Sequence, residues 1–189
     1  MTDKHSITLV IGGCRSGKSR YALDAADAIG GNQKIFLATS VPRDAEMEKR
    51  VQTHQAERGP DWTTVEEPTQ IHQVIETRSA GANVILVDCL TLWTTNLLMA
   101  GFVEAGIRDQ VSMLTAALAR SQCPVFLVTN EVGYGIVPEN SLARQFRDLA
   151  GMVNQRVADA ANRVVLTVAG IDVQIKPKAG QAKPGGGTF

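Results

Sequence analysis

One glycine-rich stretch near the start of the chain has the residues needed to hold a run of phosphates. Residues 12–19 read GGCRSGKS and fit the phosphate-binding loop pattern G-x-x-x-x-G-K-[ST]. In such a loop, backbone N–H groups surround the phosphates, and glycines allow the close approach and positive φ angles that a side chain would obstruct. Lys18 can then reach the β- and γ-phosphate oxygens, while Ser19 can bind Mg²⁺. The motif predicts that the chain binds a nucleoside triphosphate.

An acid at the end of an apolar run is a second candidate for this chemistry. Val84–Val87 is continuous hydrophobic sequence, and Asp88 follows it directly. In loop-type nucleotide enzymes an acid in this position lies beside the triphosphate and holds Mg²⁺ directly or through water. An acid that ends a strand can also have a purely structural role, but the phosphate loop upstream favours the catalytic one. We therefore predict that Ser19 and Asp88 bind the metal.

A histidine in the segment from Arg43 to Arg58 is a third candidate. Arg50, His54 and Arg58 are spaced by four, so on a helix they lie on one face with the imidazole between two guanidiniums. Two fixed positive charges lower the pKa of a histidine and favour its neutral form at pH 7. A neutral imidazole can attack phosphorus while the arginines stabilise phosphate oxygens. The alternative, an exposed histidine among ordinary helix charges, stays open on spacing alone.

Other polar and aromatic residues have weaker signals. Glu66 follows a Trp-Thr-Thr-Val run and could accept hydrogen bonds from a base or ribose, although the pattern equally fits a loop acid. His5 precedes the first apolar run, and His72 is expected on a polar helix face, so neither is assigned a role. Trp62 and Trp93 are expected to pack in the core or an interface.

Several near-continuous hydrophobic segments recur along the chain with helical patterns between them. Such segments are typical of strands covered on both faces, as in a parallel sheet flanked by helices. Strands are predicted over Ile7–Ile11, Lys34–Ala38, Val84–Val87, Val125–Thr129 and Val164–Val168. Val173–Ile175 is a candidate for a short final strand, with antiparallel pairing as one option. Helices are predicted over Ser19–Ile29, Ala45–Arg58, Thr69–Arg78, Thr91–Ala100, Gly106–Arg120 and Ser141–Asn162.

Length and composition limit the classes of protein to consider. A chain of 189 residues suits one α/β domain with a full core and is short for two. The formal net charge is zero, so no overall field draws the protein toward nucleic acid or an anionic membrane. No apolar run approaches the ~20 residues that span a bilayer, and the early first strand leaves no room for a signal peptide. Three widely spaced cysteines fit a reducing cytoplasm better than disulfides or a zinc site.

The composition changes near the end of the chain. Residues 1–175 are expected to form the nucleotide-binding domain. Residues 176–189 are rich in Lys, Pro and Gly and lack an apolar face that could pack, so they are expected to form a flexible tail.

The whole pattern resembles the bifunctional adenosylcobinamide kinase / adenosylcobinamide-phosphate guanylyltransferase family of cobalamin biosynthesis, from about Thr8 to Lys176. The phosphate loop is shared by many families, whereas the His54 segment and the Thr-Asn-Glu-Val-Gly stretch are much more specific. The segments that carry the resemblance are Gly12–Arg20, Ala38–Ser40, Glu46–Met47, Arg50–Arg58, Trp62–Glu66, Asp88–Leu98, Val128–Asn140, Ala143–Asp148, Gly151 and Asn154–Gln155.

The resemblance implies two reactions. ATP or GTP first phosphorylates the aminopropanol hydroxyl of adenosylcobinamide. The histidine matched by His54 then attacks the α-phosphate of GTP, and the guanylylated histidine passes GMP to adenosylcobinamide phosphate, giving adenosylcobinamide-GDP. Lys18 and His54 are the expected catalytic residues, with Mg²⁺ as cofactor. The resemblance also implies a P-loop NTPase fold with a RecA-like, mostly parallel sheet in a single domain, and a homotrimer. Residues that match nucleotide-contacting segments are Gly12, Gly13, Cys14, Arg15, Ser16, Gly17, Lys18, Ser19, Ala38, Thr39, Ser40, Gln55, Ala56, Glu57, Arg58, Glu66 and Asp88.

A phosphate loop also occurs in proteins with other functions. A simple small-molecule kinase would use His54 only to bind phosphate and would form no covalent intermediate. A GTP-dependent switch usually recognises guanine through Asn-Lys-x-Asp, which this chain lacks. An ATP-driven transporter or nucleic-acid motor lacks support too, because there is neither a Leu-Ser-Gly-Gly-Gln signature nor a basic face. The preferred phosphate donor, the corrin-contacting residues and the roles of Asn130 and Glu131 stay open.

Overall fold

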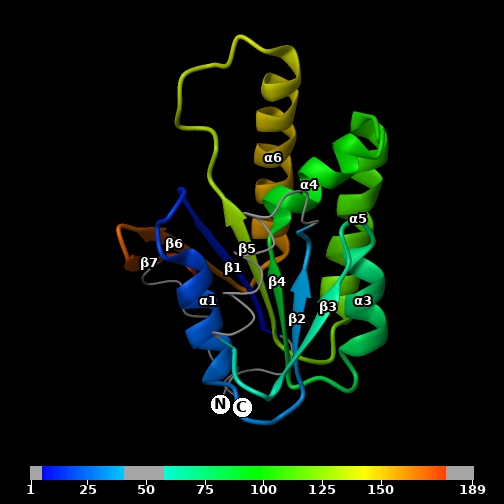
Figure 1. Ribbon diagram of the computed structural model, residues 1–189, viewed down its shortest axis with the longest axis vertical. Helices are drawn as coiled ribbons and strands as arrows, with labels where there is room; N and C mark the ends of the chain where they lie inside the picture. Colours follow the sequence, from blue (N-terminus) through cyan, green and yellow to red (C-terminus); the bar gives the residue numbers. More distant parts are fainter. Residues whose placement is uncertain (1–5, 41–57, 178–189) are drawn as a thin grey trace, which may run out of the picture.

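A central sheet organises the computed structural model, which describes residues 6–40 and 58–177 (Figure 1). Within these residues the sheet has seven strands in the order β3-β2-β4-β5-β1-β6-β7. All neighbouring pairs are parallel except β6 and β7, which are antiparallel. The strands are β1 (Ile7–Gly12), β2 (Lys34–Ala38), β3 (Trp62–Glu66), β4 (Val84–Asp88), β5 (Val125–Asn130), β6 (Arg163–Val168) and β7 (Ile171–Lys176).

Helices cover both faces of this sheet. One face carries α1, and the opposite face carries the other four helices of the described residues (Figure 1). The helices are α1 (Lys18–Asp27), α3 (Ile71–Arg78), α4 (Leu90–Met99), α5 (Glu104–Arg120) and α6 (Ser141–Ala160). This is the single α/β domain with a mostly parallel sheet that the hydrophobic segments predict.

The side chains of each strand alternate between the two helical layers, as strand geometry requires. Val10, Leu86 and Val128 point toward α1 and pack with its Ala22 and Ala26. The residues next to them in sequence point to the other face. This alternation also fixes which face the residues at the strand ends take.

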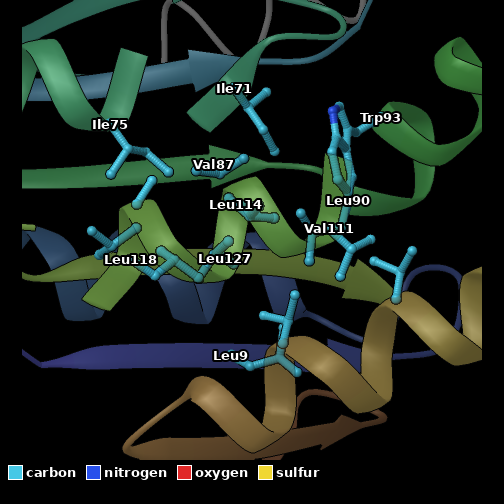
Figure 2. Close-up of a cluster of buried hydrophobic side chains, with 14 of the residues drawn as sticks. Leu9, Ile71, Ile75, Val87, Leu90, Trp93, Val111, Leu114, Leu118 and Leu127 are labelled. Atoms are coloured by element: carbon cyan, nitrogen blue, oxygen red, sulfur yellow. The ribbon is translucent and has the colours of Figure 1, made fainter. Parts of the chain in front are cut away.

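The larger core lies between the sheet and α3–α6. Figure 2 shows side chains of β1, β4 and β5 meeting side chains of α3, α4 and α5 in this cluster. Trp93 is fully buried, and its indole Nε1 donates to the carbonyl of Thr69 at 2.7 Å. A buried tryptophan needs such an acceptor, because an unpaired N–H in the core is costly. The prediction that Trp93 packs in the core is confirmed.

Among the described residues, the predicted strands and helices lie within a few residues of those observed, with one omission. No strand is predicted over residues 62–66, where the structure has β3. It is an edge strand whose Thr63 and Glu66 are exposed, so it lacks the continuous apolar run of the inner strands. The candidate strand near residue 173 is β7, and it is antiparallel. The predicted helix over Ala45–Arg58 lies outside the described residues except for Arg58, which is at a bend.

The expectation that His72 lies on a polar helix face is wrong. Its side chain is buried in α3 together with Ile71 and Ile75. α3 packs against α5 as well as the sheet, so its buried face is wider than the apolar residues alone suggest.

Candidate functional site

The glycine-rich loop joins the carboxyl end of β1 to the first turn of α1. Gly12 ends the strand, and Lys18 begins the helix. A Cβ at Gly12 would lie 2.5 Å from both the Ser16 hydroxyl and the Thr167 carbonyl, so only glycine fits there. Gly17, the residue before the helix, has φ +96°, and Arg15 has φ +54°. Left-handed residues beside right-handed ones turn successive N–H groups into one concavity, the arrangement that binds anions.

Neighbouring segments hold this loop in place. Ser16 and Thr167 of β6 share a hydroxyl–hydroxyl bond of 2.8 Å, and both side chains are buried. The backbone N–H of Gly170, in the β6–β7 turn, donates to the Ser16 carbonyl at 2.9 Å. The N–H of Glu131, just after β5, donates to the Gly12 carbonyl at 3.0 Å. The conformation of the loop is therefore built into the fold.

The two reactive side chains of the motif lie at the start of α1. The Lys18 ammonium crosses the loop and donates to the Gly13 carbonyl at 3.0 Å. Lys18 and Ser19 are both partly exposed, whereas Gly13 and Cys14 are exposed, with nothing near the position of a Cβ at Gly13. The mouth of the loop is thus open to a ligand and adds the partial positive charge of a helix N-terminus.

The register of the sheet places Asp88 at the carboxyl end of β4, level with the end of β2. It ends β4 and pairs with Ala38 of β2, on the face that carries α1. Thr39 is fully buried beyond Ala38, and its hydroxyl donates to the Cys89 carbonyl and accepts from the Cys89 N–H, both at 2.8 Å. The Thr39 N–H also donates to the Asp88 carbonyl at 3.2 Å. The predicted segment Ala38–Ser40 therefore anchors the end of β4 through Thr39.

A pocket of about 440 Å³ brings three predicted site residues together. It runs along α1 on the sheet face that this helix covers. Ser19, Arg58 and Asp88 all contribute to its wall, although they are far apart in the sequence. The full lining is Ser19, Arg20, Leu23, Asp24, Phe36, Arg58 and Asp88.

Arg58 is held against the wall of this pocket by an aromatic ring. Its guanidinium carbon lies 3.5 Å from the centre of the Phe36 ring, and its Nη2 donates to the Thr64 hydroxyl at 3.3 Å. Stacking and hydrogen bonding together orient a cation beside Ser19 and Asp88. A fixed guanidinium suits a site that binds phosphate oxygens.

Other predicted residues fall elsewhere or outside the described part of the chain. Glu66 ends β3, beside Ala38 in the register, and is exposed at the same edge of the sheet without lining the pocket. His54 lies in the segment 41–57, outside the described residues. The same holds for Gln55, Ala56 and Glu57.

Burial makes one thiol near the site unreactive. Cys89 follows Asp88 and caps α4 by accepting from the Leu92 N–H at 3.5 Å. Desolvation, with a smaller contribution from the Asp88 charge, raises the pKa of Cys89 from 9.0 to about 11. Cys89 is therefore a neutral thiol at physiological pH and does not compete as a nucleophile.

Some residues of the site had no signal in the sequence. Thr167 and Phe36 lie inside apolar runs and read only as strand residues. Their contacts with Ser16 and Arg58 depend on which strands are neighbours, and a local pattern does not contain that information. Thr167 is a polar residue within an otherwise apolar run of β6, and this is the one feature of the sequence that could have drawn attention to it.

Within residues 6–40 and 58–177, no cluster of three or more His, Cys, Asp or Glu side chains could hold a metal. None of the helices in this part of the chain combines the length and hydropathy needed to cross a membrane.

Comparisons with known proteins show which family the chain belongs to. The bifunctional adenosylcobalamin biosynthesis protein CobU of Salmonella typhimurium is 45% identical over 182 residues, covering 89% of this chain and 98% of that protein. CobP of Pseudomonas aeruginosa, with the same description, is 38% identical over 168 residues, covering 89% and 96%. The flagellar accessory protein FlaH of Methanocaldococcus jannaschii has a similar structure, with a TM-score of 0.51 at 14% identity, covering 89% of this chain and 75% of FlaH.

At that identity FlaH supports the α/β fold alone. The family assignment comes from the sequence. Residues 8–175 match the family model described as cobinamide kinase / cobinamide phosphate guanyltransferase. The chain belongs to this kinase and guanyltransferase family.

Proposed function

We propose that the protein carries out two successive transfers at the pocket beside the phosphate loop. It phosphorylates adenosylcobinamide with ATP or GTP, and it then transfers GMP from GTP through a guanylylated His54. Membership of the kinase and guanyltransferase family carries this proposal, and the wall formed by Ser19, Arg58 and Asp88 supports it.

In the first transfer the hydroxyl of the aminopropanol group attacks the γ-phosphorus. The bond between the γ-phosphorus and the bridging oxygen breaks, the nucleoside diphosphate leaves, and the hydroxyl proton passes to water. The loop N–H groups and Lys18 stabilise the charge on the phosphate oxygens, and they do so with little rearrangement because the fold holds the loop in place.

In the second transfer an imidazole nitrogen of His54 attacks the α-phosphorus of GTP. A P–N bond forms, the bond to the β-phosphate oxygen breaks, and pyrophosphate leaves. A phosphate oxygen of adenosylcobinamide phosphate then attacks the same phosphorus and releases the imidazole. This gives adenosylcobinamide-GDP, and the P–N bond keeps the group ready for transfer.

The chain length supports a role for His54 at this pocket. His54 precedes Arg58 by four residues, so their Cα atoms can be at most about 14 Å apart. Arg58 lines the pocket, and Thr39, just before the segment, is bonded to the end of β4. Both flanks of the segment that carries His54 are therefore attached to the site.

We also propose Mg²⁺ as the cofactor. Ser19 and Asp88 would hold it, since they line one pocket and supply the oxygen ligands that Mg²⁺ prefers. One carboxylate and one hydroxyl are enough, because Mg²⁺ in such sites takes its other ligands from phosphates and water. When bound, the ion would neutralise negative charge on the phosphate oxygens.

A homotrimer located in the cytoplasm completes the proposal, on resemblance to the family. Exposed apolar side chains around the start of α6 support contact between subunits: Tyr134, Ile136, Val137 and Leu142 are all more than half exposed. Light scattering should give three times the 20.3 kDa chain mass, and a monomer would contradict this part.

A two-step product assay tests the proposed function. Purified protein, adenosylcobinamide, ATP, GTP and Mg²⁺ should yield adenosylcobinamide phosphate and then adenosylcobinamide-GDP, separated by chromatography. His54→Ala should stop at the phosphate, whereas Lys18→Ala should lose both products. His5→Ala, at a histidine with no assigned role, is the matched control and should behave as the wild type.

The outcomes distinguish a covalent role of His54 from a role in phosphate binding alone. If His54→Ala still forms adenosylcobinamide-GDP at the wild-type rate, the covalent route is wrong. If the wild type forms only the phosphate, the protein is the simple small-molecule kinase.

A further inference from the structure

Asn130 ends the strand that lies between the two halves of the phosphate site. β5 is hydrogen-bonded to β1, which leads into the loop, and to β4, which ends at Asp88. In the register Asn130 pairs with Gly12, while Asp88 pairs with Val128. Asn130 therefore lies two residues beyond the level of Asp88, at the edge where parallel sheets bind ligands.

The alternation along β5 gives the face that Asn130 takes. Val128 and Phe126 pack on the α1 side of the sheet. Thr129 points to the opposite side, where its hydroxyl donates to Asn154 Oδ1 of α6 at 2.7 Å. Asn130 follows the period of Val128 and so is on the α1 side. That is the face of Asp88 and of the start of α1, with Lys18 and Ser19.

The backbone of Asn130 is held on both sides. Its N–H donates to the Thr91 hydroxyl at 2.7 Å, and its carbonyl accepts from Asn154 Nδ2 at 3.1 Å. Thr91 belongs to α4 and Asn154 to α6, so two helices fix the end of this strand. A carboxamide on such a backbone is preorganised, as a group that acts on a reacting phosphate must be.

The side chain of Asn130 does not take part in this network. Its Oδ1 is buried and has no hydrogen-bond partner among the described residues. A buried amide oxygen is normally paired, so one left over at the edge of a ligand site indicates that its partner is a ligand. The amide also carries an NH₂ donor, which suits a phosphate oxygen.

We propose that Asn130 is a catalytic residue of the phosphoryl transfer. Its NH₂ donates to an oxygen of the γ-phosphoryl group, and its Oδ1 accepts from the attacking hydroxyl, which aligns nucleophile and phosphorus. This inference rests on the proposed function and assigns Asn130 a part in the first of its two transfers. No proton is taken up by the amide, so its role is orientation and charge stabilisation.

Binding of two nucleotides separates this role from a structural one. A contact with the γ-phosphoryl group contributes to the affinity for ATPγS and not to that for ADP. Titration calorimetry with Mg²⁺ should show that Asn130→Ala weakens ATPγS binding by about tenfold or more, while ADP affinity stays within about twofold. Asn130→Asp keeps the shape but sets a carboxylate against the phosphate, so it should lose more. Steady-state phosphorylation by Asn130→Ala should show kcat lowered by about 10².

A second asparagine provides the matched control. Asn140 caps α6 by accepting from the Ala143 N–H at 3.1 Å, away from the strand ends. Asn140→Ala should lower the thermal midpoint and leave the ratio of ATPγS to ADP affinity unchanged.

Each outcome has one meaning. If Asn130→Ala keeps the wild-type ratio of the two affinities, or lowers both equally, Asn130 has only a structural role and the inference is overturned. If the wild type binds neither nucleotide, the proposed function itself fails.

Discussion

At the scale of single residues, the site depends on groups whose neighbours leave them little freedom. Gly12 has no room for a side chain, and Thr39 bonds both polar groups of the Cys89 backbone. The types of Gly12, Lys18 and Ser19 could be predicted from the motif, because the chemistry of phosphate binding demands them at that spacing. The partners that hold them, Thr167 above all, come from distant strands and could not be predicted in this way.

The buried thiol beside Asp88 predicts a loss of stability at high pH. The folded-state pKa of Cys89 is about 11, above its ordinary 9.0, so the folded protein holds this proton more tightly than the unfolded chain. The resulting stability is complete below pH 9 and is lost as pH rises to 11. It amounts to about 3 kcal/mol at most.

Denaturation in urea at pH 8 to 11 measures this contribution. Cys89→Ser keeps an acceptor for the α4 cap and does not titrate in this range. The free energy of unfolding should fall less steeply with pH in Cys89→Ser than in the wild type. Parallel curves for the two proteins would show that the thiol does not contribute.

At the scale of elements, the proposed site lies at the edge of the sheet formed by the carboxyl ends of the parallel strands. The proposed nucleotide-binding groups lie at or just after the carboxyl ends of β1, β4 and β5, and β6 with its turn to β7 supports the phosphate loop. The inner strands could be predicted closely, because burial on both faces leaves an uninterrupted apolar run. β3 could not be predicted, since an edge strand with exposed polar residues lacks that run. His72 shows the same limit for a helix, because α3 packs against α5, a contact that the residues of α3 alone do not reveal.

The support from β6 predicts an effect at a distance from the motif. Thr167→Val keeps the shape of the side chain and removes the hydroxyl that bonds Ser16. The Ser16 hydroxyl then loses its buried partner, at a cost of about 1–3 kcal/mol. We expect ATP binding to weaken by about tenfold, because the loop N–H groups no longer converge as well.

Calorimetric titration with ATP, alongside a thermal melt, measures this effect. Thr77→Val is the matched control, because Thr77 is exposed on α3 and its hydroxyl bonds only within that helix. The control should bind ATP normally. Normal binding by Thr167→Val as well would mean that β6 does not hold the loop in its active conformation.

At the scale of the whole molecule, one α/β domain serves two transfers that differ in the phosphorus attacked. A kinase needs the γ-phosphorus next to the acceptor hydroxyl, and a guanylyltransferase needs the α-phosphorus next to a nucleophile. A triphosphate seated in the loop by its β- and γ-phosphates extends its α-phosphate and nucleoside away from the loop. Ser19 and Arg58 line one pocket along α1, and Arg58 follows His54 by four residues in the sequence. We therefore regard both transfers as using one bound triphosphate orientation.

Labelling of the protein by GTP tests this account most directly. Incubation with Mg²⁺ and GTP carrying ³²P at the α-phosphorus should leave label on the denatured protein, stable in base and labile in acid, as a phosphorus–imidazole bond requires. Peptide mapping should find GMP on His54, and GTP labelled at the γ-phosphorus should leave nothing. Wild-type protein that never retains α-label, or His54→Ala protein that retains it fully, would contradict the account.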